Sequence, residues 1–412
     1  MRYLIRVCLV LCAGLIIVTD SFSQSSPTTS YGDLADKVNT ITTAVPFLMI
    51  APDSRSGAMG DVGVAISPDA NSMHWNPAKY AFVEKDMGLS ISYTPWLRAL
   101  IDDINLGYLS GYKRIDNSQA VGMSLLYFSL GDITFTNDVG DYMGQFSPNE
   151  FAVDMSYSRL FSNRVAGGLA FRYIHSNLTG GVYVGGVQSH PGNAVSSDIS
   201  VYYQNDDIEI DEKNALLAFG MNLSNIGTKI SYTENQDRDF IPMNMKLGGS
   251  LTIDFDEYNS LSFASDINKL MTPTPPLYDE DSTGVLVIVA GKDPNVAVPV
   301  GMFQSFCDAP GGFREEMNEL TYSVGIEYWY AKQFALRAGY FDEHQNKGNR
   351  KYFTVGFGIK LNVFGLDFAY LIPRHQKNPL ENTLRFTLLF DFEGLKSADE
   401  GKNPRKPSIN TK

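Results

Sequence analysis

The sequence contains few cysteines, few charged residues and no long hydrophobic run outside its first twenty residues. Cys8 and Cys12 lie near the N-terminus of the 412-residue chain, and Cys307 is the third and last cysteine. Beyond the N-terminus, a disulfide framework and a cysteine-based metal site are therefore excluded. A helical membrane protein would need several apolar stretches of about 20 residues, and the sequence does not contain them.

Basic residues are outnumbered by acidic ones, 33 Lys+Arg against 46 Asp+Glu, for a formal net charge of -13. Proteins that bind nucleic acid present a basic surface, so nucleic acid is not expected as a partner. Charged residues make up 19% of the chain and aromatic residues 12%. A disordered chain would show the opposite balance, and the composition therefore indicates a folded protein.

Residues 1–23 have the pattern of a secretory signal peptide. Arg2 and Arg6 give a basic start, residues 7–18 are apolar or small, and small residues precede the predicted cleavage before Gln24. The apolar stretch is too short to be an anchor across a bilayer core of about 30 Å. The chain is therefore expected to be exported.

Alternation of apolar and polar residues with period 2 recurs through the rest of the chain and predicts β-strands. In the last of them Phe386, Leu388 and Phe390 share one face, and Arg385 and Thr387 share the other. A membrane-spanning strand needs about 9–11 residues, and ordinary globular strands average about 5–6. The fourteen predicted strands, mostly 9–12 residues long, are 87–95, 103–112, 118–129, 149–160, 164–175, 195–204, 214–225, 243–254, 258–267, 320–330, 333–342, 350–361, 364–373 and 382–392.

The connections between the predicted strands alternate in length. Those after even-numbered strands are mostly tight, as at 362–363, with exceptions at 113–117 and 205–213; those after odd-numbered strands are longer, up to 268–319. Outer-membrane barrels have short periplasmic turns and long outer loops, and closure leaves no sheet edge in lipid. The sequence therefore predicts an all-β, 14-stranded antiparallel transmembrane β-barrel over residues 87–392, in the outer membrane. A soluble, aromatic-rich β protein is the alternative.

Three segments lie outside the predicted barrel. Residues 24–43 are polar and expected to be flexible, and the charged tail 393–412 is expected to be disordered. Residues 44–86 are rich in small residues and are expected to form a plug inside the barrel. Within the longest loop, the apolar run 285–289 argues against simple disorder. It is expected either to bind a partner or to fold over the barrel mouth.

The sequence contains no recognisable catalytic or metal-binding motif, and no catalytic, cofactor-binding or metal-binding residue is predicted. No H-E-x-x-H, G-x-S-x-G or Walker pattern occurs. His74 is expected to be a packed residue rather than a ligand. Cys307 is expected to be a buried small residue rather than a nucleophile. Asp279, Glu280 and Asp281 are expected to form a solvated loop rather than a calcium site.

Eight charged residues fall on the polar faces of the predicted strands. In a membrane barrel they must face the lumen, because a charge on the lipid face costs about 2–4 kcal/mol at mid-depth. We expect them to pair with one another or with the plug, and a transport path is the alternative. They are Arg172, Lys246, Asp266, Arg337, Lys360, Asp367, Arg385 and Asp391.

One segment carries a family resemblance. Residues 51–65, APDSRSGAMGDVGVA, followed by Asn76-Pro77-Ala78, resemble the N-terminal region of the FadL-type outer-membrane barrels. They resemble more closely the PorV family of the type IX secretion system. The related PorQ barrels are the main alternative assignment. The similarity is expected to extend over residues 44–392.

The resemblance implies a FadL-like barrel with an N-terminal plug, no enzyme activity and no cofactor. PorV proteins are understood to bind the C-terminal β-sandwich signal domain of secreted cargo at the translocon SprA. They then deliver the cargo to the sortase PorU, in an attachment complex with PorZ and PorQ. The resemblance thus implies these partners, beside outer-membrane lipid, and assigns cargo binding to the loops 130–148, 176–194, 226–242 and 268–319.

Two other classes of function remain open. A FadL-like transporter of hydrophobic small molecules or fatty acids would hold its ligand in an apolar pocket under the loops. The glycine pairs 167–168 and 248–249 would allow strands to bend for lateral release. An outer-membrane lipid-modifying enzyme would need a Ser/His/carboxylate cluster at the outer rim, where His175, His190 and His344 are predicted to lie.

Overall fold

The computed structural model describes residues 38–392, apart from 99–100, 102, 137–138, 140–141, 182, 185–186, 234–237 and 375–378. The predicted signal peptide, most of the predicted flexible segment and the predicted tail therefore lie outside the described residues. Within the described part of the chain, no helix is long and apolar enough to cross a membrane.

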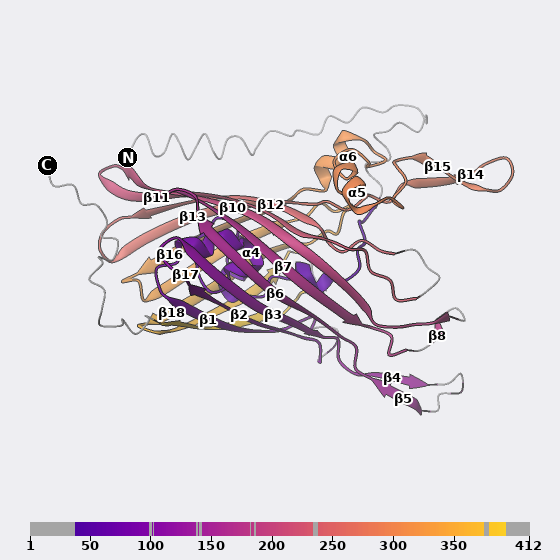
Figure 1. Ribbon diagram of the computed structural model, residues 1–412, viewed down its shortest axis with the longest axis horizontal. Helices are drawn as coiled ribbons and strands as arrows, with labels where there is room; N and C mark the ends of the chain where they lie inside the picture. The colour runs from indigo at the N-terminus through magenta and orange to yellow at the C-terminus, as the bar shows by residue number, and fades with distance from the viewer. Residues whose placement is uncertain are drawn as a thin grey trace.

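Fourteen antiparallel strands form one closed barrel (Figure 1), so the all-β class and the fourteen predicted strands are confirmed. Each strand pairs with the next in the barrel, and the last pairs with the first from Met87–Phe392 to Tyr93–Phe386. The strands are β1 (Met87–Pro95), β2 (Asn105–Arg114), β3 (Gln119–Ser129), β6 (Asn149–Leu160), β7 (Val165–Asn177), β10 (Gly192–Ile210), β11 (Lys213–Gly227), β12 (Asn244–Asp254), β13 (Asn259–Leu270), β16 (Thr321–Tyr330), β17 (Phe334–Asp342), β18 (Lys351–Leu361), β19 (Phe364–Pro373) and β20 (Leu384–Phe392).

The outer face of the barrel is apolar and the inner face is small or polar. In β3, Val121, Met123 and Leu125 are exposed on the outside, whereas Ala120 and Ser124 are buried on the inside. A soluble barrel would show the reverse, because its apolar side chains fill the core. The observed alternation is that of a barrel surrounded by lipid, which excludes the soluble alternative.

The predicted connection 205–213 is wrong. Strands β10 and β11 continue through it to a two-residue turn at Asp211 and Glu212, both with positive φ. The register of this pair shifts between Asn205 and Ile208. Such a bulge breaks the period-2 alternation, which is why the sequence pattern ended the strands too early.

The long connections lie together at the opposite end of the barrel from the short turns and contain structure of their own (Figure 1). The largest predicted loop holds a hairpin and two helices rather than an irregular chain. The additional elements are β4 (Ile133–Thr136), β5 (Tyr142–Phe146), β8 (Tyr183–Val184), β9 (Val187–Gln188), β14 (Leu277–Glu280), β15 (Leu286–Ala290), α5 (Val298–Gln304) and α6 (Phe313–Asn318).

Residues 45–83, here called the inner segment, are almost all buried and lie within the barrel (Figure 1). The segment is a chain of short helical turns, and side-chain caps start two of them: Asp53 accepts a hydrogen bond from Ser56 N, and Asn76 accepts one from Ala78 N. It contacts the walls formed by β3, β6 and β7 and by β18, β19 and β20. Its elements are η1 (Pro46–Met49), α3 (Ser54–Gly57), α4 (Ser72–Trp75) and η2 (Pro77–Phe82).

Candidate functional site

The inner segment rests directly on glycines of the barrel wall. A Cβ atom built at Gly339 would lie 2.1 Å from the carbonyl carbon of Met59 and 2.2 Å from Gly60 N. At Gly168 it would lie 2.6 Å from Ala78 N. These neighbours are backbone atoms, which cannot turn aside as a side chain can. Glycine at these wall positions therefore permits the close approach of two backbones.

The bends expected for a lateral-release transporter are not found at the glycine pairs 167–168 and 248–249. Strands β7 and β12 pair with both neighbours in unbroken register through these positions. Gly168 makes room for Ala78, and Gly248 makes room for the Asp266 carboxylate, whose Oδ1 lies 2.1 Å from the position that a Cβ would take. The bend hypothesis for these residues is therefore wrong. Gly168 and Gly248 serve packing within the lumen, whereas Gly167 and Gly249 lie on the outer face beside Phe161 and Phe219.

A buried ionic network ties the inner segment to three strands. Arg55 of α3 donates to Glu327 of β16 through Nη2 (2.8 Å) and Nε (3.0 Å), and to Asp69 through Nη1 (3.0 Å). Arg337 of β17 donates to Glu327 (2.7 Å) and to Asp367 of β19 (2.6 Å). The last pair reaches across β18. All five side chains are largely or fully buried.

Two further predicted inward charges hold the inner segment. Arg385 donates to Asp61 (Nη1 to Oδ1, 3.1 Å). Asp266 Oδ2 accepts hydrogen bonds from the backbone of Gly63 (2.7 Å) and Val64 (3.0 Å). These contacts confirm the prediction that the lumen charges pair with one another or with the inner segment.

Arg172 pairs within the wall, with Asp154 (2.5 Å) and Asp198 (3.3 Å). Lys360 and Asp391 pair with each other at 2.7 Å, and Lys360 is exposed near the short-turn end. The buried acceptors Glu327, Asp154 and Asp198 were not predicted. Each lies on the same strand face as buried serines or alanines, so the period-2 alternation of its strand indicates that it faces the lumen.

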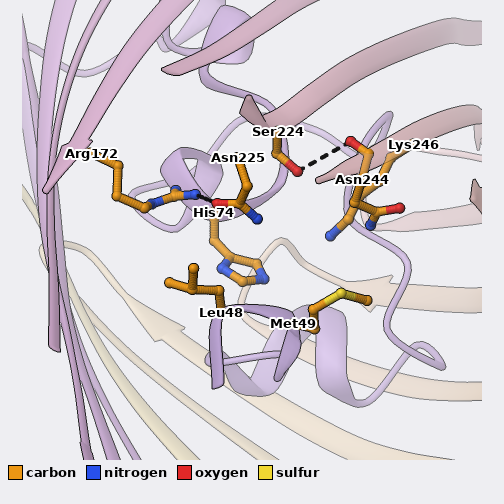
Figure 2. Close-up of a pocket in the computed structure, with 8 residues that line it drawn as sticks. All are labelled: Leu48, Met49, His74, Arg172, Ser224, Asn225, Asn244 and Lys246. Atoms are coloured by element: carbon orange, nitrogen blue, oxygen red, sulfur yellow. Dashed lines mark hydrogen bonds between the residues drawn. The ribbon is translucent and has the colours of Figure 1, made fainter. Parts of the chain in front are cut away.

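A small cavity separates the inner segment from β7, β11 and β12 (Figure 2). About 10 Å³ of it is open to the centre of a water molecule, which is room for about one water. His74 faces this cavity and packs edge-on against Trp75, with ring centroids 4.9 Å apart. Lys246 lies over the same indole ring at 4.5 Å. The cavity is lined by Leu48, Met49, His74, Arg172, Ser224, Asn225, Asn244 and Lys246.

An apolar cluster fills the barrel under the outer loops, where a transporter would need an open pocket. Phe47 of the inner segment stacks on Phe128 of β3 with centroids 6.2 Å apart. Side chains of the inner segment, the wall and the loops complete the cluster. Its buried members are Val45, Phe47, Leu48, Ile104, Leu106, Tyr108, Leu126, Phe128, Ala152, Ile174, Ala194, Ile230, Ile241, Met243 and Met271.

Residues 271–320, here called the rim module, are fastened to the barrel by a second buried ionic cluster. Lys269 donates to Glu316 (3.0 Å) and Glu319 (2.6 Å). Lys347, from the connection between β17 and β18, donates to Glu315 (2.6 Å) and Glu319 (3.0 Å). Because these charges are buried and satisfied mutually, they fix the module in one position on the rim.

The hairpin β14–β15 projects from the rim module (Figure 1) and forms a two-stranded sheet of its own. All five residues of the apolar run are exposed, from 38% for Ile288 to 65% for Leu286. The alternative that this run folds over the barrel mouth is therefore wrong. Asp281 shapes the turn by accepting hydrogen bonds from Thr283 (2.7 Å) and Val285 N (3.0 Å), and these bonds lower its pKa. It is a solvated turn residue, as expected.

The structure corrects the prediction for Cys307. The residue is exposed, in the turn between α5 and α6, and Lys292 Nζ lies 3.0 Å from its sulfur. The expectation of burial failed because the rim module buries ionic side chains against the barrel and leaves this turn on the outside.

The three rim histidines are not assembled into one site. His175 contacts Asn193 (2.8 Å), His190 contacts the carbonyl oxygen of its neighbour Pro191, and His344 accepts from Asn346 N (3.3 Å). Among the described residues, no group of three or more His, Cys, Asp or Glu side chains is placed to hold a metal ion. The arrangement therefore gives no support to a lipid-modifying enzyme.

Replacing Asp308 with asparagine should stabilise the rim module above pH 6. Burial, and to a smaller extent Glu316 and Glu319, raise the pKa of Asp308 from 3.8 to about 6, while Thr274 N and Lys269 oppose the change. The folded module thus holds a proton that the unfolded chain has lost between pH 4 and 6, so stability falls as pH rises through that window. Asp308→Asn should remove this dependence and stabilise the module by about 1–2 kcal/mol at pH 7.5.

Amide hydrogen exchange across residues 298–318 at pH 5 and pH 7.5 measures this effect. The matched control is Asp279→Asn, which removes an exposed carboxylate from the hairpin and should change neither value. Unchanged exchange in Asp308→Asn at both pH values would contradict the prediction.

The family model described as "Type IX secretion system protein PorV" matches residues 33–277. No curated protein matches the chain. Among solved structures, the chain is similar to the monoaromatic hydrocarbon channel CymD (14% identity, 84% of this chain and 98% of that chain covered, TM-score 0.45). It is also similar to the toluene transporter TbuX of Ralstonia pickettii (12%, 84% and 98%, TM-score 0.43) and to a FadL homologue of Pseudomonas aeruginosa (11%, 86% and 100%, TM-score 0.39).

These structural similarities are too weak to carry an argument about ligands. The match to the family model is strong enough to assign a family, since it spans more than half of the 412 residues and includes the inner segment and the barrel up to β13. The closed, lipid-facing barrel places the chain in the outer membrane. The chain belongs to the PorV family of outer-membrane proteins of the type IX secretion system.

Proposed function

We propose that the protein binds the C-terminal β-sandwich signal domain of secreted cargo at an SprA-like translocon. It then carries the cargo to a PorU-like sortase acting with PorZ and PorQ. Family membership supports a role in type IX secretion. The observation that carries the binding step is the apolar hairpin β14–β15, exposed at the loop end of the barrel. The proposal contains no enzymatic step, in keeping with a family of secretion proteins.

The hairpin suits a β-rich partner for two reasons. A sheet of two strands leaves a row of unpaired backbone groups along each edge, and such edges accept a further strand. Its side chains from Val285 to Val289 present apolar surface to water, which marks an interaction site when it is contiguous. A β-sandwich offers both an edge strand and apolar side chains to such a hairpin.

The rim module supports the hairpin on a fixed base. Lys269 and Lys347 hold α6 through Glu315, Glu316 and Glu319. A preordered binding element loses less conformational entropy when it binds than a flexible loop does. The ionic cluster therefore favours binding by the hairpin without touching the partner.

We further propose that residues 44–86 act as a plug, so that cargo is carried on the rim and does not pass through the lumen. The burial of the inner segment, its backbone contacts with wall glycines and its ionic links to the wall all support a closed lumen. The water-sized polar cavity shown in Figure 2 is consistent with a filled interior.

Charging the hairpin should weaken cargo capture about tenfold while leaving the barrel intact. Leu286 and Val289 are the most exposed residues of β15, at 65% and 58%, so aspartate at both positions should be tolerated in the fold. In a pull-down from detergent-solubilised outer membranes, we expect recovery of cargo to fall about tenfold, the loss of roughly 1.4 kcal/mol or more of binding free energy. Mass spectrometry of the co-purified proteins gives the measurement.

The matched control is Ile115→Asp, an exposed apolar residue in the short turn between β2 and β3, at the opposite end of the barrel from the loops. Equal cargo recovery from the control and the charged β15 variant would remove the hairpin from the proposal. Purification of the wild-type barrel alone with bound fatty acid would instead favour the transporter hypothesis.

A further inference from the structure

The rim module packs against the outer side of the barrel wall around α6, whereas Val298 and Met302 of α5 pack against the apolar cluster at the barrel mouth. In β13, Phe263 and Ile267 point outward and are exposed. Lys269 has the same parity in an unbroken register, so it also points outward, yet it is 4% exposed. Its ammonium group is covered by Glu316 and Glu319 at the C-terminal end of α6. Figure 1 likewise shows α5 and α6 outside the outline of the wall at its loop end.

The module begins where the lipid-facing band of the barrel ends. Ile267 of β13 lies opposite Tyr322 of β16, and both side chains are exposed on the outer face. Lys269 follows two residues later, about 7 Å further along the strand. Tyrosine is typical of the boundary between acyl chains and head groups. The part of the module around α6 therefore lies at the level of the membrane interface.

The outer face of the module is apolar over both helices and the turn between them. Phe303 and Phe313 are 70% and 78% exposed, and Val300, Phe306 and Met317 are also exposed. Between residues 294 and 313, Asp308 and Cys307 are the only ionisable residues, and Asp308 is buried. In the sequence, the cationic residue Lys292 stands shortly before this stretch and Arg314 directly after it.

We propose that the outer face of α5 and α6 rests in the outer leaflet of the outer membrane, with Phe303, Phe306 and Phe313 among the upper acyl chains. The apolar surface adjoins the lipid-facing band of β13 and β16, so one lipid layer can cover both. Aromatic side chains with flanking cations are the composition of segments that lie in a membrane interface, where the cations meet lipid phosphates.

This lipid contact goes beyond cargo binding and would set the height of the hairpin. Because β14–β15 leaves the same module, burying α5 and α6 in the leaflet would hold the hairpin at a fixed distance above the membrane. A protein partner covering the same surface is the competing occupant, and the experiment below separates the two.

Quenching by nitroxide-labelled lipid tests the proposal on the purified full chain. With the native cysteines replaced by serine, a single Phe303→Cys is labelled with bimane. The protein is placed in nanodiscs of phosphatidylethanolamine and phosphatidylglycerol, with or without doxyl groups high on the acyl chain. We expect about a twofold loss of fluorescence with the doxyl lipids, as for an Ile267→Cys reference at the upper edge of the lipid-facing band. A label at Leu286→Cys on the hairpin should keep its fluorescence.

Phe313→Cys provides a second site on the same surface in case the first variant does not fold. If labels at positions 303 and 313 are quenched no more than the hairpin label, the module lies in water and the proposal is overturned. The surface would then be left for a protein partner. The sample contains only the chain and lipid, so the outcome does not depend on whether the cargo hypothesis holds.

Discussion

A valine at position 339 should detach the inner segment from the barrel wall. Two backbone atoms of Met59 and Gly60 lie within 2.2 Å of the position that a Cβ would take. Gly60 is held at this position because its N–H donates to Thr354 Oγ1 of β18 at 2.8 Å. Overpacking of this kind costs about 1–3 kcal/mol, and here it acts between two backbones. We expect a lower urea midpoint in lipid vesicles and an open lumen.

Ion conductance in planar bilayers reports the lumen directly. The wild-type protein should conduct poorly because the inner segment fills the barrel, and Gly339→Val should open a measurable current. Gly107→Val is the matched control, since a Cβ there points to the lipid side and its nearest neighbour is 4.0 Å away. A closed Gly339→Val barrel of wild-type stability would show that the segment is not held at this glycine and would weaken the plug hypothesis.

The strands of this fold could be predicted because lipid imposes a strict alternation. Phe386 and Arg385 must lie on opposite faces of β20, since the outer face cannot carry a charge at low cost. The alternation predicted the strand ends wrongly where the chain leaves the lipid-facing band and the outer face can carry polar residues. The bulge in β10 between Asn205 and Ile208 lies towards the short-turn end, and its extra residue reverses the parity from which strands are recognised.

The candidate interaction surface was only partly predictable. The apolar run in the longest loop indicated a structured element. The contacts that fasten the rim module to the barrel could not be predicted, because they join residues far apart in the sequence. Lys347 and Glu315 are 32 positions apart and meet only because the barrel brings the β17–β18 connection beside the module. The burial of Lys269 on the outward face of β13 was hidden in the same way, because a local pattern does not reveal which distant segment covers a residue.

Replacing Arg337 with methionine should cost about 3–5 kcal/mol of stability, the typical penalty for breaking a buried ion pair from one side. Arg337 links Glu327 (2.7 Å) and Asp367 (2.6 Å). Glu327 would keep Arg55, but Asp367 would be left at 3% exposure with no ion-pair partner among the described residues. Urea unfolding in vesicles measures the loss. The exposed pair Arg164–Asp207 is the control, and Arg164→Met should cost at most about 1 kcal/mol.

A double variant separates the loss of an attraction from the penalty of a stranded charge. If Asp367 is destabilising because it is buried without a cation, Arg337→Met with Asp367→Asn should recover much of the loss, and the two changes should be strongly non-additive. If the single change acts only by removing the packing of the arginine stem, the second change should recover nothing. Recovery would also explain why cations and carboxylates alternate in the lumen: Glu327 accepts hydrogen bonds both from Arg55 of the inner segment and from Arg337 of the wall, so each buried charge has a partner of opposite sign.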